Sequence, residues 1–243
     1  MAIITISRQQ GSGGAELARR LAQILGYRLV DKEILAHVAA MARVPIEQVQ
    51  QFADDDGNVI QRFLHAVARG IPDLDDYYQT FAEMYTEHDP RLNDYVYYGQ
   101  GEGQADFSKL HREDCLKYFE SAIRDIAERG NTVLVGRGSQ VLLADFPHTL
   151  HVRVTASLKS RIDAVAREDL FDEKQAAERI AESERRRAHY LQVNYGRNVD
   201  DVVLYDLVLR MDHLAIDQVV EFIRKWAAGE TVRHETELKG GSV

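Results

Sequence analysis

Four residues near the N-terminus, Gly11-Ser12-Gly13-Gly14, have the types and spacing that suit the binding of a phosphate group. Glycine has no Cβ, so the backbone of such a cluster can come close to an anion. The cluster follows the β-branched run Ile3–Ile6 and precedes a stretch with a helical apolar face. The first N–H groups of a helix have no partner within the helix, so a glycine turn before a helix can direct them at a phosphate. We therefore predict a phosphate-binding turn; the alternative is a tight strand-to-helix turn without a ligand.

This turn departs from the standard phosphate loop, G-x-x-x-x-G-K-[ST], in which the lysine bonds the outer phosphates and the hydroxyl holds magnesium. Aligned on the second glycine of that pattern, the chain has Arg8 at the first glycine, Gly14 at the lysine and Ala15 at the hydroxyl. We expect Arg8 or another arginine to supply the missing positive charge. Ser12 and Glu16 are candidates for contacting magnesium, and the sequence leaves the metal ligands unknown.

Two further segments carry arginine where a ligand is expected. The apolar run Thr132–Val135 is typical of a buried parallel strand, and it leads into Gly136-Arg137-Gly138. Open α/β sheets bind their ligands at the carboxyl ends of such strands. The second segment is Arg185-Arg186-Arg187, in a very polar helix predicted from Asp172 to about Tyr190. A guanidinium group can bind two phosphate oxygens at once, so both segments suit a phosphorylated ligand.

The elements that would position these residues alternate between strand and helix. This alternation predicts a three-layer α/β fold around a five-stranded parallel sheet with right-handed crossovers. The strands are expected at about 3–6, 27–30, 132–136, 149–155 and 206–210. Gly26 is expected to end the first helix in a left-handed conformation, and Ser157 to cap a later one. A long helix is predicted from about Ser108 to Arg129, and a last one from Ile216 to Trp226.

The chain is predicted to form a single domain over about 1–229, with a mostly helical insert at about 45–107. The insert region contains six of the eleven tyrosines, and we interpret it either as a substrate-facing lid or as a surface excursion packed by its tyrosines. A turn is expected at 54–58. The arginine-bearing segment at about 172–200 is interpreted as a second lid. The tail at 230–243 has few apolar residues and is predicted to be disordered.

Composition narrows the class of protein. The 243 residues carry a net charge of −9, which argues against nucleic acid as the main partner because a phosphate backbone is bound through lysine and arginine. No apolar stretch reaches the roughly 20 residues of a membrane helix, so no membrane is expected. The N-terminus shows no secretion signal, and the lone Cys115 suits a reducing cytoplasm. The chain is expected to bind a small molecule and to form a possible homo-oligomer.

With these segments placed, the chain resembles the cytidylate kinase-like family, a branch of the P-loop nucleoside monophosphate kinases. ITISRQQGSGGAELA followed by LVDKEIL is similar to the opening of that family. VLVGRGSQVLL followed by LHVRVTASLKSRIDAV is similar to its Gly-Arg segment, ERRRAHY to its arginine-bearing lid, and YDLVLRMDHLAIDQVVEFI to its closing strand and helix.

The resemblance implies ATP as the phosphoryl donor, Mg²⁺ between the substrates and CMP or a related nucleoside monophosphate as the acceptor. Phosphoryl transfer depends on positioning and on neutralising charge spread over several oxygens. On this reading the residues Gly11, Ser12, Gly13 and Gly14 wrap the donor phosphates. Arg185 and Arg187 close over the transferring group, and Arg8 supplies catalytic charge. Arg137 holds the acceptor phosphate, while Asp31 and Tyr190 face the acceptor nucleotide.

Each of these assignments has a structural alternative. A surface ion pair is the alternative for the arginines, and it is the expected state of Arg186. A helix N-cap is an equally good explanation of Asp31. The sequence also departs from the family pattern in lacking acidic residues beside Arg137.

Two functions follow from the sequence. The first is ATP-dependent phosphoryl transfer, by an enzyme of the nucleoside monophosphate kinase type. The second is a catalytically weak or inactive regulatory protein that binds nucleotide with the kinase fold. The missing lysine favours the second function and the arginines of the polar helix favour the first, because a closing clamp serves a reaction.

Overall fold

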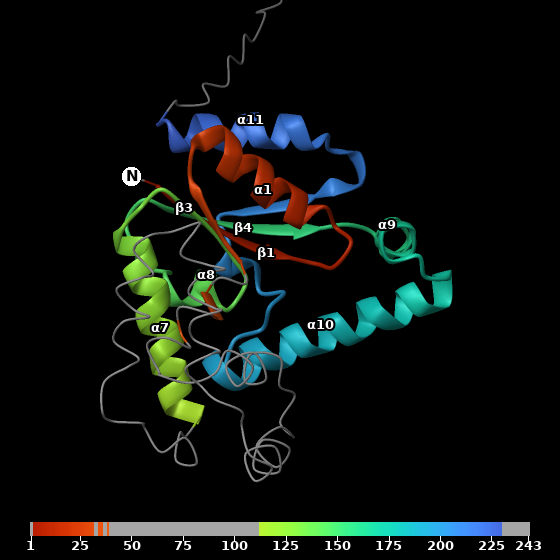
Figure 1. Cartoon of the computed structure of the whole chain (residues 1–243), viewed down its shortest axis with the longest axis horizontal. Helices are drawn as coiled ribbons and strands as arrows, with labels where there is room; N and C mark the ends of the chain where they lie inside the picture. Colours follow the sequence, from red (N-terminus) through yellow and green to blue (C-terminus); the bar gives the residue numbers. More distant parts are fainter. Residues whose placement is uncertain (1, 32–33, 36–37, 39–111, 230–243) are drawn as a thin grey trace, which may run out of the picture.

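The computed structural model describes residues 2–31, 34–35, 38 and 112–229, and its centre is a parallel β-sheet (Figure 1). The sheet has five strands in the order β2-β3-β1-β4-β5. The strands are β1 (Ile3–Arg8), β2 (Arg28–Val30), β3 (Thr132–Val135), β4 (Thr149–Thr155) and β5 (Leu207–Arg210). Every neighbouring pair is parallel, so all carboxyl ends meet at one edge. The predicted sheet is confirmed, and β1 continues to Arg8 instead of ending at about residue 6.

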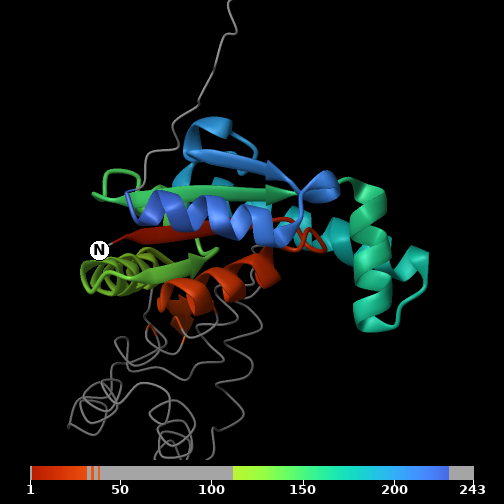
Figure 2. The same cartoon turned by 90° about the horizontal axis from the view of Figure 1, so that it is seen from above.

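Helices cover both faces of the sheet. They are α1 (Gly14–Leu25), α7 (Arg112–Glu128), α8 (Ser139–Leu142), α9 (Leu158–Asp169), α10 (Glu173–Tyr195) and α11 (Ile216–Ala227), with the 3₁₀ helices η2 (Val202–Leu204) and η3 (Met211–His213). Figure 1 shows α1 and α11 on one side of the sheet and α7, α8 and α10 on the other. Figure 2 shows α9 beyond the carboxyl ends of the strands. The predicted three-layer α/β architecture is therefore confirmed.

The two faces of β1 bury different clusters, as the alternation of side chains along a strand requires. Ile4 and Ile6 belong to a cluster with Leu17 of α1. Ile3 points to the other face and belongs to a cluster with Phe119 and Ile123 of α7. All six side chains are 2% exposed or less, so β1 lies at the centre of the core and its carboxyl end is firmly placed.

The ends of the helices follow the local sequence. Gly26 has a φ of 65° and ends α1, as predicted. Ser157 accepts a hydrogen bond from the Ser160 N–H at the start of α9, which confirms the predicted cap. The polar helix α10 is longer than predicted: it passes Tyr190 and ends at Gly196, which adopts the left-handed conformation of a C-cap with a φ of 63°. Tyr195 is thereby carried on the same helix as the arginine cluster.

Several predictions lie outside the described residues. These are the insert at about 45–107, the turn at 54–58, the tail at 230–243 and the start of the long helix before Arg112. Ile34, Leu35 and Val38 are described, and all three are helical and buried. Across the ranges that the structure covers, no helix has both the length and the apolar character needed to span a membrane.

One buried titratable group lies within the sheet. His151 of β4 pairs with Thr5 of β1, and its Nδ1 is 2.7 Å from the Thr5 hydroxyl oxygen. Burial lowers the pKa of His151, and the nearby Asp206 carboxylate and the Leu143 backbone only partly oppose this effect. The folded protein therefore holds this histidine neutral at a pH where an exposed histidine would take up a proton.

Thermal unfolding should report this difference. As pH falls below about 6.5, the unfolded chain protonates His151 while the folded chain does not, so the free energy of unfolding decreases until the lower folded pKa is reached. We expect His151→Gln to reduce the loss of Tm between about pH 7 and about pH 5. The same change at the exposed His213 should leave that loss unchanged. Equal pH slopes for the wild type and His151→Gln would contradict the prediction.

Candidate active site

The turn after β1 is folded tightly around two glycines. Gly11 and Gly13 have φ values of 76° and 80°, in the left-handed region that side chains other than glycine disfavour. Within the turn, the Gln9 carbonyl accepts hydrogen bonds from the Ser12 N–H (3.2 Å) and from the Ser12 hydroxyl (2.7 Å). Gly13 is the N-cap of α1, so the first N–H groups of that helix begin directly beyond the turn. This arrangement is the one predicted for a phosphate-binding turn.

Packing against α9 also requires glycine at position 11. A Cβ at Gly11 would lie 2.6 Å from the backbone oxygen of Arg161, so α9 packs directly on the turn. Gly11→Ala should therefore destabilise the protein by more than the roughly 1–2 kcal/mol of left-handed strain alone. Gly26→Ala is the matched control, since Gly26 is also left-handed but a Cβ there would meet nothing within 4 Å. Chemical denaturation of both variants measures the difference, and equal losses would contradict the packing argument.

The backbone of Gly14 lies in close contact with the side chain of Arg8. A Cβ at Gly14 would lie 2.6 Å from the Arg8 Cβ and 3.3 Å from the Arg8 Cδ, closer than real Cβ atoms normally come. The standard loop has a glycine at the position of residue 8 and a lysine at the position of residue 14. Here the two kinds of residue are exchanged, with a positive side chain at position 8 and glycine at position 14. A Cβ at Gly14 would also lie 3.2 Å from the Val154 Cβ, so Arg8 and Val154 together occupy the space that a lysine stem at position 14 would need.

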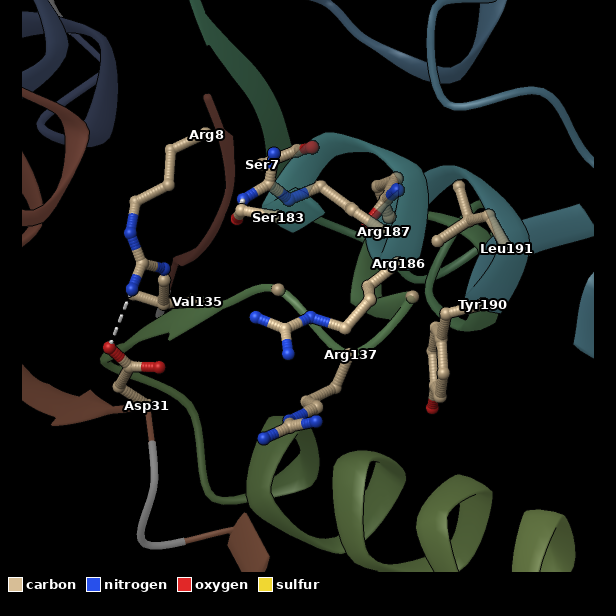
Figure 3. A pocket seen from close by; sticks show the side chains of 13 residues that line it. Ser7, Arg8, Asp31, Val135, Arg137, Ser183, Arg186, Arg187, Tyr190 and Leu191 are labelled. Atoms are coloured by element: carbon tan, nitrogen blue, oxygen red, sulfur yellow. Dashed lines mark hydrogen bonds and ion pairs between the residues drawn. The ribbon is translucent and has the colours of Figure 1, made fainter. Parts of the chain in front are cut away.

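A pocket of about 230 Å³ lies at the carboxyl ends of β1 and β3, beneath α10 (Figure 3). Of the predicted site residues, its lining includes Arg8, Asp31, Arg137, Arg187 and Tyr190. The predicted phosphate turn, residues 11–14, is not part of the lining and lies beside it at the end of β1.

Two arginines of the polar helix differ from what the sequence predicted. Arg185 is exposed and does not line the pocket. Arg186 does line it, and it also forms the ion pair expected of a surface residue, with Glu182 at 3.1 Å. Figure 3 shows Arg186 and Arg187 extending from α10 toward the strand ends. The structure therefore brings Arg186 to the pocket and leaves Arg185 outside it.

Arg187 lies among other positive charges. Its Nη2 donates to the Ser183 hydroxyl at 3.3 Å, and among the described residues no carboxylate lies within ion-pair distance of it. Burial lowers the pKa of Arg187 to about 10, and repulsion from Arg153 and Arg8 adds to the effect, against a weaker opposing influence of Glu184. A cluster of like charges held together in this way is stabilised by a bound anion.

Arg153 was not predicted as part of the site. It is 4% exposed and lies in β4, where it pairs with Ser7 of β1, a residue that lines the pocket. Its Nη1 donates to the Ser7 hydroxyl at 2.8 Å and its Nη2 donates to Asp200 at 2.9 Å. The guanidinium carbon also lies 5.8 Å from the centre of the Tyr205 ring. These contacts fix the Arg153 charge in place beside Arg187.

Arg8 and Asp31 face each other at neighbouring strand ends. The Arg8 Nη2 lies 3.0 Å from the Asp31 Oδ2, and both side chains are partly exposed to the pocket. The alternative explanation of Asp31, a helix N-cap, involves residues 32 and 33, which lie outside the described residues. The ion pair joins the residue predicted to bind the donor to the residue predicted to bind the acceptor.

Arg137 occupies an unusual backbone conformation. Gly136, Arg137 and Gly138 have φ values of 73°, 57° and 73°, so three successive residues are left-handed. Such a conformation costs on the order of 1–3 kcal/mol for a residue with a side chain, and strain of this kind is concentrated at functional sites. It turns the chain sharply after β3 and places Arg137 in the pocket.

Tyr195 locks α10 onto this turn. A Cβ at Gly138 would lie 2.4 Å from the Tyr195 ring, and the Tyr195 hydroxyl lies 3.5 Å from the Arg137 carbonyl oxygen. The Tyr190 ring packs edge-on against Tyr195, with 6.0 Å between the ring centres. Sequence reasoning missed Tyr195 because the helix was predicted to end before it.

A second contact joins α10 to the phosphate turn. Glu184 accepts a hydrogen bond from Arg161 at 2.6 Å and another from Gln9 at 3.2 Å. Gln9 belongs to the turn itself, and its side-chain oxygen accepts from the Ala156 N–H at 3.3 Å. Helix α10 is therefore held at the phosphate turn through Glu184 and at the Gly-Arg-Gly turn through Tyr195, with Arg186 and Arg187 between these contacts.

The chain has relatives with known structures or names. It is 24% identical over 221 residues to a cytidylate kinase of Pyrobaculum aerophilum, which covers 90% of this chain and 89% of the relative. It is 26% identical over 230 residues to a cytidylate kinase of Methanopyrus kandleri, with 91% of both chains covered. The crystal structure of an uncharacterized protein from Eubacterium ventriosum shares the fold, with a TM-score of 0.59 and 20% identity over 94% of this chain and 98% of that one.

The family model described as the cytidylate kinase-like family matches residues 3–213. The match runs from β1, through the Gly-Arg-Gly turn and α10, to η3, and thus contains every described side chain that lines the pocket. The fold, the arginine-lined pocket and this match agree with one another, and the chain belongs to the cytidylate kinase-like family of phosphotransferases.

Proposed function

We propose that the protein transfers the γ-phosphoryl group of ATP to CMP or a closely related nucleoside monophosphate. The observation that carries this proposal is the convergence of arginines on one pocket. Four of its lining side chains are arginines (Arg8, Arg137, Arg186 and Arg187), and its one lining carboxylate among the described residues is Asp31. Such an excess of guanidinium groups suits a reaction in which negative charge is passed between two phosphorylated molecules.

Each side chain has a place in this reaction. The turn Gly11–Gly14 would wrap the donor phosphates, with Arg8 beside the outer ones. Arg187 would stabilise the charge of the transferring group, since it lies between the donor turn and the acceptor side of the pocket. Arg137 would hold the acceptor phosphate, and we propose Arg186 as its partner in the role that the sequence suggested for Arg185. Asp31 and Tyr190 would face the acceptor nucleotide.

The arginine assigned to the acceptor can be separated from the donor site. Arg137→Ala should weaken acceptor binding by about 1.5–3 kcal/mol, the usual worth of a hydrogen bond to a charged group, and leave ATP affinity nearly unchanged. Arg137→Lys keeps the charge but loses the planar fork, so it should recover only part of the affinity. Calorimetric titration with CMP and with ATP measures both values. Equal loss of both affinities would show that Arg137 maintains the structure of the site instead.

A second candidate function is supported by the missing loop lysine and hydroxyl. In that case the protein binds nucleotide as a regulatory protein and transfers phosphate slowly or not at all. A transfer assay with ATP and a panel of nucleoside monophosphates distinguishes the two functions. Production of ADP that depends on one monophosphate, with formation of its diphosphate, supports the kinase; nucleotide binding without any diphosphate supports the regulatory protein.

A further inference from the structure

We infer that guanidinium groups bind the donor polyphosphate and that the phosphate turn supplies no ligand to magnesium. Metal-free ATP therefore binds about as well as its magnesium complex. The inference rests on the proposed function, because it takes ATP as the donor. It concerns the ionic form of the nucleotide that this site recognises. Three observations on the described residues support it.

The first observation concerns the hydroxyl groups at the turn. Ala15 stands where the standard loop has the serine or threonine that holds magnesium. Ser12 has a hydroxyl, but this hydroxyl donates to the Gln9 carbonyl at 2.7 Å and the residue is 3% exposed. The turn therefore presents no hydroxyl ligand to a metal beside the phosphates.

The second observation concerns the carboxylates. Glu16 accepts hydrogen bonds from Arg19 and Arg20 at 2.6–3.0 Å, and these bonds lower its pKa. Asp31 is paired with Arg8. In the part of the chain that the structure describes, no three histidine, cysteine, aspartate or glutamate side chains are grouped so that they could hold a metal ion by themselves. Of the described carboxylates, Glu16 and Asp31 are thus both paired with arginine, and magnesium would have to compete with a guanidinium group for either of them.

The third observation concerns charge. Burial lowers the pKa of Arg187 most, and repulsion from the nearby Arg153 and Arg8 lowers it further. An anion between them relieves that repulsion, and the relief increases with the negative charge of the anion. Magnesium bound to ATP removes two of its negative charges and brings a dication close to the guanidinium groups. The arginines thus supply the positive charge that the metal supplies beside a standard loop.

Calorimetric titration of the full chain tests the inference directly. ATP is titrated once with excess Mg²⁺ and once with EDTA, at the same ionic strength. Two ligands that reinforce each other at one site usually change affinity by about 5- to 150-fold, and we expect a ratio of less than about 5 between the two dissociation constants. Tight binding only in the presence of Mg²⁺ would overturn this inference and leave the proposed function standing. No binding under either condition would overturn both.

A variant makes the test sharper. Arg8→Ala removes one guanidinium group from the cluster, so bound magnesium should contribute more to the affinity for ATP. The ratio of the dissociation constant with EDTA to that with Mg²⁺ should rise at least about 5-fold. Arg179→Ala is the matched control, since Arg179 is an exposed arginine on the same helix as Arg187 and does not line the pocket. Its ratio should equal that of the wild type. An unchanged ratio in Arg8→Ala, with its folding verified by circular dichroism, would show that Arg8 does not replace the metal.

Discussion

Arg187→Ala is expected to lower kcat by about 10²–10³, the cost of removing one donor that stabilises charge in a transition state. The effect on the dissociation constant of ATP should be much smaller, because in the proposed reaction the contact of Arg187 forms fully only as charge develops during transfer. Burial, together with repulsion from Arg153 and Arg8, lowers the pKa of Arg187, so its charge lies in a poorly solvated part of the pocket.

Arg187→Lys refines this prediction. Lysine keeps a positive charge but cannot bind two oxygens with a planar fork, so kcat should recover only in part. Arg179→Ala removes an exposed arginine from the same helix and should leave kcat at the wild-type value. Single-turnover kinetics separate the chemical step from product release. A normal kcat in Arg187→Ala, or equal losses in kcat and in ATP affinity, would show that Arg187 does not specifically stabilise the transition state.

A lysine introduced at position 14 is expected to destabilise the protein and to weaken ATP binding, and removal of Arg8 should reduce both losses. In Gly14→Lys the new side chain collides with Arg8, and such overpacking typically costs about 1–3 kcal/mol. Arg8→Gly alone creates no collision, but it loses the positive charge and the ion pair with Asp31, so ATP affinity should fall. The double variant Arg8→Gly/Gly14→Lys restores the order of the standard loop and removes the closest contact, leaving the 3.2 Å approach to Val154, so it should recover part of the stability and of the ATP affinity.

A double-mutant cycle measures this dependence. Residues in contact show interaction energies of about 0.5–3 kcal/mol, and we expect a value at the upper end of this range for both unfolding and ATP binding. Strictly additive effects would contradict the conclusion that Arg8 occupies the place of the lysine. A double variant that is stable but does not bind ATP would confirm the packing argument and refute the proposed role of the Arg8 charge.

The fold was predictable because its main signals are local. The apolar runs at Ile3–Ile6 and Thr132–Val135 need no distant partner to be recognised as strands. Gly26 and Ser157 mark helix ends through their own backbone and side-chain properties. The end of α10 was predicted too early, because residues 191–195 continue the helix past Tyr190 and the left-handed Gly196 ends it.

The site was less predictable because its geometry depends on contacts between distant residues. Consecutive residues on a helix point in directions about 100° apart, so only one or two of three adjacent arginines can face the pocket. Tyr195 and Glu184 decide which ones, by fixing how α10 lies against the Gly-Arg-Gly turn and Gln9. The sequence cannot reveal either contact.

Arg153 did carry a signal in the sequence. It stands in the otherwise apolar part of β4, and a charged residue at such a position is rarely buried unless it is paired. Its partners, Ser7 and Asp200, are 146 and 47 residues away in the chain, so the pairing became visible only in the folded structure.

The most direct test of this account is a crystal structure of the protein with an ATP analogue and CMP. We predict that the donor phosphates lie against the N–H groups of residues 11–16 with Arg8 beside them. The phosphate of CMP should contact Arg137, and Arg187 should lie between the two nucleotides. Nucleotides bound elsewhere, with the turn at residues 11–14 and the arginine-lined pocket both empty, would contradict the account.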